Sequence, residues 1–507
     1  MNKKDVILKN SGMGLVSQAI IILFTFLTRN LFIKYIGIEL LGLNSTFSSV
    51  LNTLSLAELG FQSAIVFSLY KPLYEGAQDE INSIMNIFKW IYTYIGIFFV
   101  AASLVVTPLL KYIITGIQVT YKIYVYFIFQ AFASTCTYFL AYKRALLYAD
   151  QKDYISKSID LFFNIIFSIL QCVAIVVLRS YIIYLILKIL QTYTANLVVH
   201  MYCTIHYPYL KKSKIDNQKL KDIWTNVKNI FAGRIASYIY TSTDNLVISA
   251  VISTISVGYF TNYTTITTSL KTLTNSILSP IVPIIGNYLV DESDQRKREN
   301  IFRLYTFARY LIALIIIVPT IILIDSFIAV WIGSEMILEK TIVFLLGFDF
   351  YIHIVHSATA DFINGTGMFK EDKYVEIVGA ITNISLSVVL VYSMGITGVL
   401  IGTVVSQMIF WFGRSAIVYF KCLKLSFDRY ISYWLENVMY ILLAIVLTCV
   451  LSVGYDSLQI KHKLIKFIAG GCICELIILI VVFCVFSRSK KMKWLINAFK
   501  LRCFKST

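Results

Sequence analysis

Charged residues are scarce in this chain: they make up 14% of its 507 residues, whereas 58% of the residues are hydrophobic. Soluble globular domains contain about 25% charged residues, so this composition excludes an ordinary soluble protein. The chain also lacks low-complexity segments and stretches that resemble strands. The sequence therefore predicts an all-α integral membrane protein, because helices satisfy their own backbone hydrogen bonds within lipid.

Cysteine pairs with the spacing of a metal site are also missing. The nine cysteines are scattered, mostly through apolar runs, and the only close pair is Cys472 and Cys474. One intervening residue is too short for the usual zinc spacing, so no metal site is predicted. The formal net charge of +17 would suggest nucleic acid in a soluble protein. In a membrane protein basic loops hold the topology instead, so no nucleic-acid partner is predicted.

The apolar runs predict about 14 transmembrane helices, since a spanning helix needs about 20 mostly apolar residues. Their expected bounds are 12–36, 42–69, 84–110, 121–147, 155–178, 181–205, 227–251, 256–288, 302–325, 341–364, 374–394, 396–420, 433–454 and 464–487. When basic residues at the ends of spans are counted with the adjoining loops, 30 of the 45 Lys and Arg residues fall on one side of the membrane and 7 on the other. Basic loops stay inside the cell, so both termini are predicted to be cytoplasmic.

Two segments of the chain begin almost identically, with TRNL at residue 28 and TDNL at residue 243. Gly42 and Gly258 keep nearly the same offset, as do Asn164 and Asn383. This offset maps each helix onto the sixth after it, so we expect two parallel-repeat six-helix lobes around a central cavity, plus two C-terminal helices. The expected domains are an N-terminal lobe at 1–206, a basic cytoplasmic linker at 207–226, a C-terminal lobe at 227–424, and the two extra helices with a basic tail at 425–507.

Three stretches resemble a known family. They are SGMGLVSQAIIILFTFLTRNLFIKYIGIELLGL from residue 11, SLAELGFQSAIVFSLYKPL from residue 55, and NGTGMFKEDKYVEIVGAITNISLSVVLVYSMGITGVLIGTVVSQ from residue 364. Their pattern of short motifs resembles that of the bacterial polysaccharide (O-antigen) flippases of the Wzx type. These belong to the multidrug/oligosaccharidyl-lipid/polysaccharide (MOP) exporter superfamily. The resemblance implies twelve core helices in two lobes and two more at the C-terminus. It also implies an undecaprenyl-diphosphate-linked oligosaccharide as cargo.

Four charges lie inside predicted spans, where each costs at least about 2.5 kcal/mol unless it faces a partner or a wet cavity. Arg29 and Asp244 occupy the same place in the two repeated segments, with opposite sign. Glu58 and Lys271 lie near the middle of the following helices, 213 residues apart. Two interpretations stand side by side. The charges either form the ion pairs Arg29–Glu58 and Asp244–Lys271, or they line the central cavity.

The family's cargo carries a diphosphate, which needs cationic donors. Under the second interpretation Arg29 and Lys271 are the first candidates to bind it, and Arg234 is another cation on the same helix as Asp244. Lys89 and Lys188 lie near predicted span ends, where we expect their side chains to reach toward the headgroups.

The stretch FDFYIHIVHSATADF places Asp349, His353 and His356 at i, i+4 and i+7, on one face of a helix. These residues either carry a proton through the transport cycle or form a polar cavity lining without titrating. Pro280 and Pro283 should kink their helix, because each removes a backbone hydrogen bond, and the kink is a candidate hinge.

The expected function is a flippase that moves lipid-linked oligosaccharide repeat units to the outer leaflet by alternating access, for synthesis of a capsule or O-antigen-like polysaccharide. The alternative is a cation-coupled antiporter of drugs or organic cations from the same superfamily. The external loops are short and carry no paired carboxylates, which argues against an enzyme. We expect a monomer in the bacterial plasma membrane, beside a polymerase and glycosyltransferases, with no cofactor and with H⁺ or Na⁺ as coupling ion.

Overall fold

The protein is described by a computed structural model, in which residues 3–55, 61–211, 242–278, 294–366 and 368–494 are placed. Every secondary-structure element in these ranges is a helix, which confirms the all-α prediction. Contacts within the chain divide it into two units. The first unit is Met1–Thr261 with Val391–Gly395, and the second is Asn262–Leu390 with Ile396–Thr507.

Eleven helices among the described residues are long and apolar enough to cross a membrane. Each of them overlaps one of the fourteen predicted spans. The other three predictions, 42–69, 227–251 and 256–288, run into ranges that lie outside the described residues. The multi-pass character is therefore confirmed, and the number fourteen stays a prediction.

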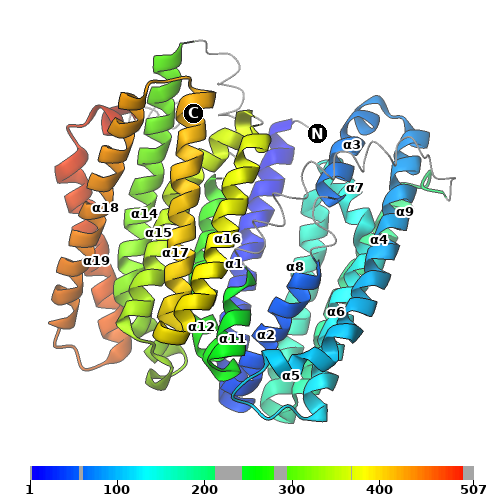
Figure 1. Ribbon diagram of the computed structural model, residues 1–507. Helices are drawn as coiled ribbons and strands as arrows, with labels where there is room; N and C mark the ends of the chain where they lie inside the picture. The colour runs from blue at the N-terminus through cyan, green and yellow to red at the C-terminus, as the bar shows by residue number, and fades with distance from the viewer. Residues whose placement is uncertain (1–2, 56–60, 212–241, 279–293, 367, 495–507) are drawn as a thin grey trace. The chain divides into compact units, whose positions relative to one another are not determined.

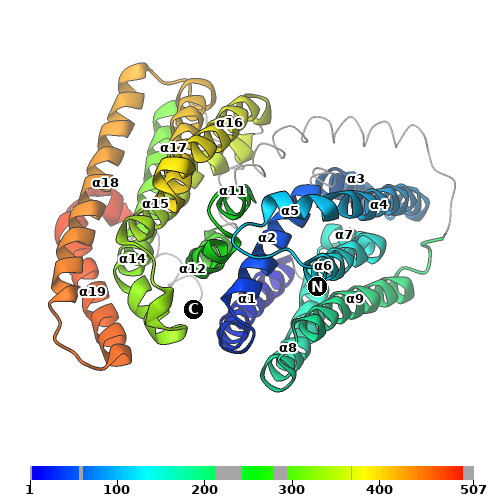
Figure 2. The ribbon, with the colours of Figure 1, turned by 60° about the horizontal axis from the view of Figure 1, so that its bottom comes forward.

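The first unit consists of helices that pack as neighbours in a bundle (Figure 1). They are α1 (Lys3–Tyr35), α2 (Ile38–Leu54), α3 (Phe61–Glu75), α4 (Gln78–Val106), η2 (Thr107–Leu109), α5 (Leu110–Ile113), α6 (Tyr121–Leu140), η3 (Ala141–Lys143), α7 (Arg144–Ala149), α8 (Asp153–Val173), η4 (Ala174–Leu178), α9 (Tyr181–His206) and α11 (Asp244–Val251). Seen closer to end-on, α8 lies beside both α1 and α9 (Figure 2).

The second unit is built around α14 and α15, which contact each other along their length (Figure 1). Its elements are α14 (Gln295–Trp331), η5 (Ser334–Met336), α15 (Lys340–Thr366), α16 (Phe369–Met394), α17 (Ile396–Ala416), η6 (Ile417–Cys422), α18 (Phe427–Asp456) and α19 (Lys463–Phe486), with most of α12 (Thr254–Leu278). Large aromatic side chains fill the interior. Trp411 is fully buried and donates to the Tyr433 hydroxyl at 2.9 Å, and Tyr310 stacks on Tyr440.

The element order repeats between the units. In the first, α6 packs against α4 and α9; in the second, α15 packs against α14 and α17. Asn164 and Ser168 fall on α8, and their counterparts Asn383 and Ser387 fall on α16. Residues related by the sequence offset thus lie on helices that hold the same position in the order of helices of each unit. A parallel repeat requires this.

The duplicated glycines face each other within the first unit. A Cβ atom on Gly42 would lie 2.1 Å from the carbonyl oxygen of Thr254, and one on Gly258 would lie 2.8 Å from that of Ile38. Thr254 follows Ile38 by 216 residues, as Gly258 follows Gly42. Such reciprocal contacts between equivalent residues are those of a two-fold axis. Only glycine permits this close approach of α2 and the start of α12.

Candidate functional site

The first unit contains a polar cavity of about 320 Å³ between α1, α2, α8 and α9. Its lining combines two cations, several amides and hydroxyls, and aromatic rings. The polar lining residues are Thr25, Thr28, Arg29, Asn44, Asn164, Ser168, Gln171, Tyr184, Lys188 and Gln191. No carboxylate occurs among the described residues that line it.

Helical periodicity brings the side chains of this cavity together. Asn164, Ser168 and Gln171 follow one another at i, i+4 and i+7 along α8, which places them on one helix face. Tyr184, Lys188 and Gln191 follow the same spacing along α9. Gln171 donates to the side-chain oxygen of Gln191 at 3.1 Å and so joins the two stripes. The cavity is therefore lined by facing polar stripes of two adjacent helices.

Arg29 of α1 is held at the wall of this cavity by a hydroxyl group. Its guanidinium donates to Thr261 Oγ1 at 2.7 Å, and Ser45 donates to the same oxygen at 3.3 Å. Ser45 and Thr261 are again 216 residues apart, so Arg29 contacts the same crossing that Gly42 and Gly258 form. The contact fixes the direction of a charge that the sequence marked as a candidate.

Lys188 is a cation of this cavity that was predicted from the sequence to lie at a span end. Among the described residues, its ammonium group has no carboxylate within 4 Å and makes no hydrogen bond. A charge removed from bulk water without a partner is costly, so water or an anion must compensate it. The spacing Tyr184, Lys188, Gln191 is the signal that would have found it.

Lys271, the other predicted diphosphate ligand, belongs to the second unit and forms an ion pair there. Its ammonium lies 2.7 Å from Asp349 Oδ2, and Gln407 donates to the other oxygen of that carboxylate at 3.2 Å. Within its own unit, Lys271 thus pairs with a residue of the predicted His/Asp stripe. The pairing of Lys271 with Asp244, one of the two interpretations of the sequence, stays a prediction.

Other cations of the second unit are paired in the same way. Arg309 contacts Asp361 and donates to the carbonyl of Ile354 at 3.0 Å. Arg414 lies 2.7 Å from Asp372 and 2.8 Å from Glu376. These contacts compensate the charge of a buried guanidinium, that of Arg309, and of a largely buried one, that of Arg414, and they fit a structural role.

The remaining predicted site residues come from both units. His353 and His356 come from α15 with Asp349, and their ring centroids lie 5.9 Å apart. Asp244 is the first residue of α11, where a helix N-terminus favours a carboxylate. Glu58, Arg234, Pro280 and Pro283 lie outside the described residues. The roles proposed for all of these residues stay predictions.

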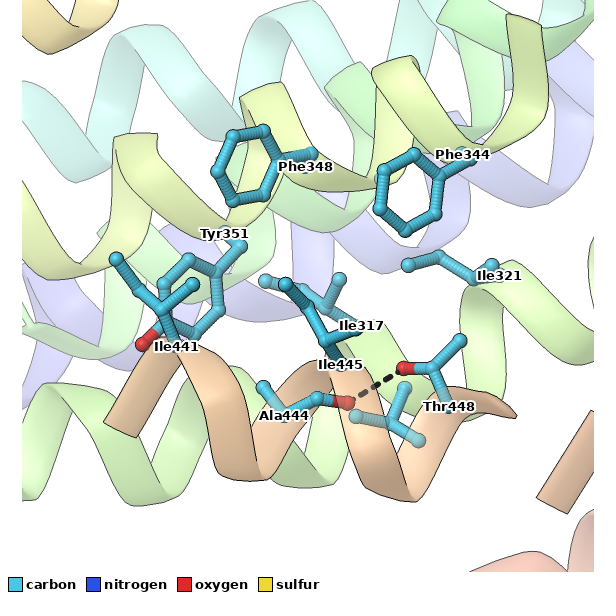
Figure 3. Close-up of a pocket in the computed structure, with 11 residues that line it drawn as sticks. Ile317, Ile321, Phe344, Phe348, Tyr351, Ile441, Ala444, Ile445 and Thr448 are labelled. Carbon is cyan, nitrogen blue, oxygen red and sulfur yellow. Dashed lines mark hydrogen bonds between the residues drawn. The ribbon is translucent and has the colours of Figure 1, made fainter. Parts of the chain in front are cut away.

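A hollow in the second unit differs in chemistry from the polar cavity. Figure 3 shows Phe344 and Phe348 of α15 on one side and Ile317 on another, with Thr448 of α18 donating to the carbonyl of Ala444. Its volume is about 20 Å³, room for roughly one water molecule. This hollow is too small and too apolar to bind a charged ligand.

Comparison with known proteins identifies the fold. No protein-family model matches the chain, and no curated protein matches it by sequence. Among solved structures, the lipid II flippase MurJ in an inward closed conformation matches with a TM-score of 0.67 and 13% identity, over 93% of this chain and 99% of that one. An inward-facing multidrug resistance MATE family transporter of the MOP superfamily matches with a TM-score of 0.63 and 14% identity, over 82% and 99%.

A third similar structure is a MOP superfamily transporter from Pyrococcus furiosus, described as having a binding pocket of reverse polarity. It matches with a TM-score of 0.56 and 13% identity, over 84% of this chain and 98% of that one. Identities this low establish likeness of fold alone. The chain shares the all-helical fold of these three structures.

Proposed function

We propose that this protein is a flippase that moves a polyprenyl-diphosphate-linked oligosaccharide to the outer leaflet by alternating access, for synthesis of a surface polysaccharide. The observation that carries the proposal is the polar cavity of α1, α2, α8 and α9, with Arg29 and Lys188 in its wall. Guanidinium and ammonium groups bind phosphate oxygens through charge-assisted hydrogen bonds. An anionic headgroup fits a cavity whose described lining is cationic.

The neutral part of the lining suits the sugars of such a cargo. Asn164, Gln171 and Gln191 offer amide donors and acceptors for hydroxyl groups, and the Tyr184 ring offers an apolar face. A few convergent polar groups beside an aromatic ring are typical of sites for polar organic ligands. The prenyl chain would remain in the lipid. The inside-negative potential favours outward movement of each negative charge by about 2.3 kcal/mol per 100 mV.

Lys271 keeps a place in this proposal through its pair with Asp349. To bind the diphosphate, the ammonium must exchange the carboxylate for phosphate oxygens. Protonation of Asp349 would release Lys271, and His353 lies one helical turn further along α15. We therefore propose that H⁺ or Na⁺ acts at this group of residues, with Glu58, Asp244 and Arg234 as further charges of the transport path.

The alternative, an antiporter of organic cations, requires carboxylates where its cargo binds. The described lining of the cavity offers cations instead. The extent of the structural matches also favours the flippase. MurJ covers 93% of this chain and the MATE transporter 82%, and this difference is about the length of α18 and α19 together.

A reconstituted transport assay tests the proposal. The protein is placed in vesicles with a fluorescent polyprenyl-diphosphate-linked oligosaccharide, and a membrane-impermeant quencher reports its arrival in the opposite leaflet. Arg29→Gln and Lys188→Gln should each slow the initial rate at least about tenfold, because each removes a charge-assisted hydrogen bond. Lys111→Gln, at an exposed residue of α5, is the matched control and should leave the rate unchanged.

Two results would contradict the proposal. The first is transport of the oligosaccharide lipid at the wild-type rate by both cavity variants. The second is exchange of an organic cation such as ethidium for H⁺ or Na⁺ by the wild-type protein, without any movement of the lipid-linked glycan.

A further inference from the structure

A second polar cavity, of about 260 Å³, lies in the first unit between α4, η3, α9 and the residues that come after α9. Three lysines line it, Lys89, Lys143 and Lys211, together with His200. His200 is twelve residues beyond Lys188 on α9, a separation of about 18 Å along the helix. The two cavities are therefore distinct sites, and the second can bind its own ligand whatever the cargo of the first.

Lys143 is the deepest cation of this second cavity. Only 6% of the residue is exposed, and its ammonium donates to Thr204 Oγ1 at 2.6 Å. Among the described residues it has no carboxylate within 4 Å. The next residue, Arg144, is compensated by two hydrogen bonds of 2.7 Å to the carboxylate of Asp160. The fold thus neutralises one of two adjacent cations and leaves the other facing the cavity.

The other two lysines of the cavity, Lys89 and Lys211, are exposed and also lack an acidic partner within the described ranges. In the part of the chain that the structure describes, neither the Lys89 nor the Lys211 ammonium has a hydrogen bond or an acidic partner. The Nδ1 atom of His200 is buried and has no hydrogen-bond partner. Three ammonium groups around one cavity repel each other, so an anion bound among them would lower their electrostatic energy.

The mouth of the cavity is held in place by backbone contacts. Asn86 donates to the carbonyl of Lys211 at 2.8 Å, and the Lys211 amide donates to Asn82 Oδ1 at 2.9 Å. These bonds tie the segment after α9 to α4 and hold the Lys211 backbone at the cavity. A site whose donors are positioned before the ligand arrives loses less entropy on binding.

The surroundings of the cavity indicate the depth of lipid headgroups. Trp90 and Tyr94 come after Lys89 on α4, are exposed, and lie with ring centroids 4.6 Å apart. Tryptophan and tyrosine concentrate at membrane–water interfaces. Basic pockets between transmembrane helices at this depth bind phosphate-bearing headgroups. The volume of about 260 Å³ leaves room for a phosphate-bearing headgroup.

We propose that the cavity of Lys89, Lys143, Lys211 and His200 is a second anion site, which binds the phosphate of an anionic membrane lipid. The lysine ammoniums donate to the phosphate oxygens, and the imidazole completes the shell. Binding joins the ends of α4 and α9 to η3 and stabilises the fold. A free diphosphate offers the same chemistry, so the experiment must separate the two sources.

Thermal unfolding of the full chain in detergent provides the test, with added phosphatidylglycerol, phosphatidylcholine or inorganic pyrophosphate. Phosphatidylglycerol should raise the unfolding temperature and phosphatidylcholine should not. Lys143→Gln should shift half-saturation to about tenfold higher phosphatidylglycerol. Lys211→Gln, at an exposed residue, should weaken binding in the same direction and keeps the test valid if Lys143→Gln does not fold.

Controls separate this site from the transport cavity. Lys111→Gln and Lys188→Gln should retain the wild-type response to phosphatidylglycerol, even where Lys188→Gln no longer transports. A response to pyrophosphate that depends on Lys143, without a response to lipid, would support the anion site and identify a soluble anion as its ligand. Equal lipid responses in wild type, Lys143→Gln and Lys211→Gln would overturn the proposal.

Discussion

The two units differ in how they compensate the cations inside their helices. In the second unit, Lys271, Arg309 and Arg414 each contact a carboxylate. In the first unit Arg144 contacts Asp160, but Lys188 and Lys143 border cavities and have no acidic partner among the described residues. A cation that is paired with a carboxylate stabilises the fold, and its removal leaves the carboxylate buried without a counter-charge. An uncompensated charge makes folding less favourable, so its retention indicates a ligand.

The largest expected effect concerns the paired cation Lys271. Lys271→Met leaves the Asp349 carboxylate buried without its ammonium, and breaking one side of a buried pair costs about 3–5 kcal/mol. Thermal unfolding in detergent should show a strongly lowered midpoint. The double variant Lys271→Met/Asp349→Leu should recover most of the loss, because an apolar pair strands no charge.

The matched control for this pair is Lys340→Met, which breaks an exposed ion pair with Asp456 at 3.5 Å. Surface pairs contribute about 0–1 kcal/mol, so the midpoint should hardly change. A Lys271→Met protein as stable as wild type would show that the Asp349 carboxylate is stable without the ammonium group. That result would contradict the difference between the two units in how they compensate cations.

An intermediate effect is expected at the glycine crossing of the first unit. Gly42→Ala adds a Cβ atom 2.1 Å from a backbone oxygen of Thr254, so the helices must separate. Overpacking of this kind typically costs about 1–3 kcal/mol, and it should lower the unfolding midpoint. Gly454→Ala on α18, where a Cβ meets nothing within 4 Å, is the control and should leave stability unchanged or slightly raised. Equal midpoints for the two variants would mean that α2 and α12 do not approach this closely.

Much of the fold was predictable because its signals are local or repeated. Composition and apolar runs can be recognised from residues that are neighbours in the sequence. The offset between the TRNL and TDNL segments is found by comparing the sequence with itself. The offset even predicted equivalence between Gly42 and Gly258, although not that they face each other. Arg29 was selected for its costly position, and it does line a polar cavity.

The partners of charged residues were not predictable in the same way. Lys271 and Asp349 are 78 residues apart, on helices that tertiary packing alone brings together. The repeat drew attention to Asp244 instead, because it stands where Arg29 does in the other copy. Lys188 was assigned to a span end because only its distance from the helix terminus was considered. The face of the helix on which it lies was not. The polar spacing from Tyr184 to Gln191 carries the missing information.

The smallest expected effect, opposite in sign, concerns Lys188. Lys188→Met keeps a side chain of similar length and removes an ammonium that has no acidic partner among the described residues, so the free energy of unfolding should rise by about 0.5–2 kcal/mol. The same variant should lose transport of the diphosphate-linked cargo. Thermal unfolding and the vesicle assay measure the two quantities on one preparation. A variant that is less stable than wild type would mean that structural contacts hold Lys188. That result would contradict its proposed role as a ligand for the diphosphate.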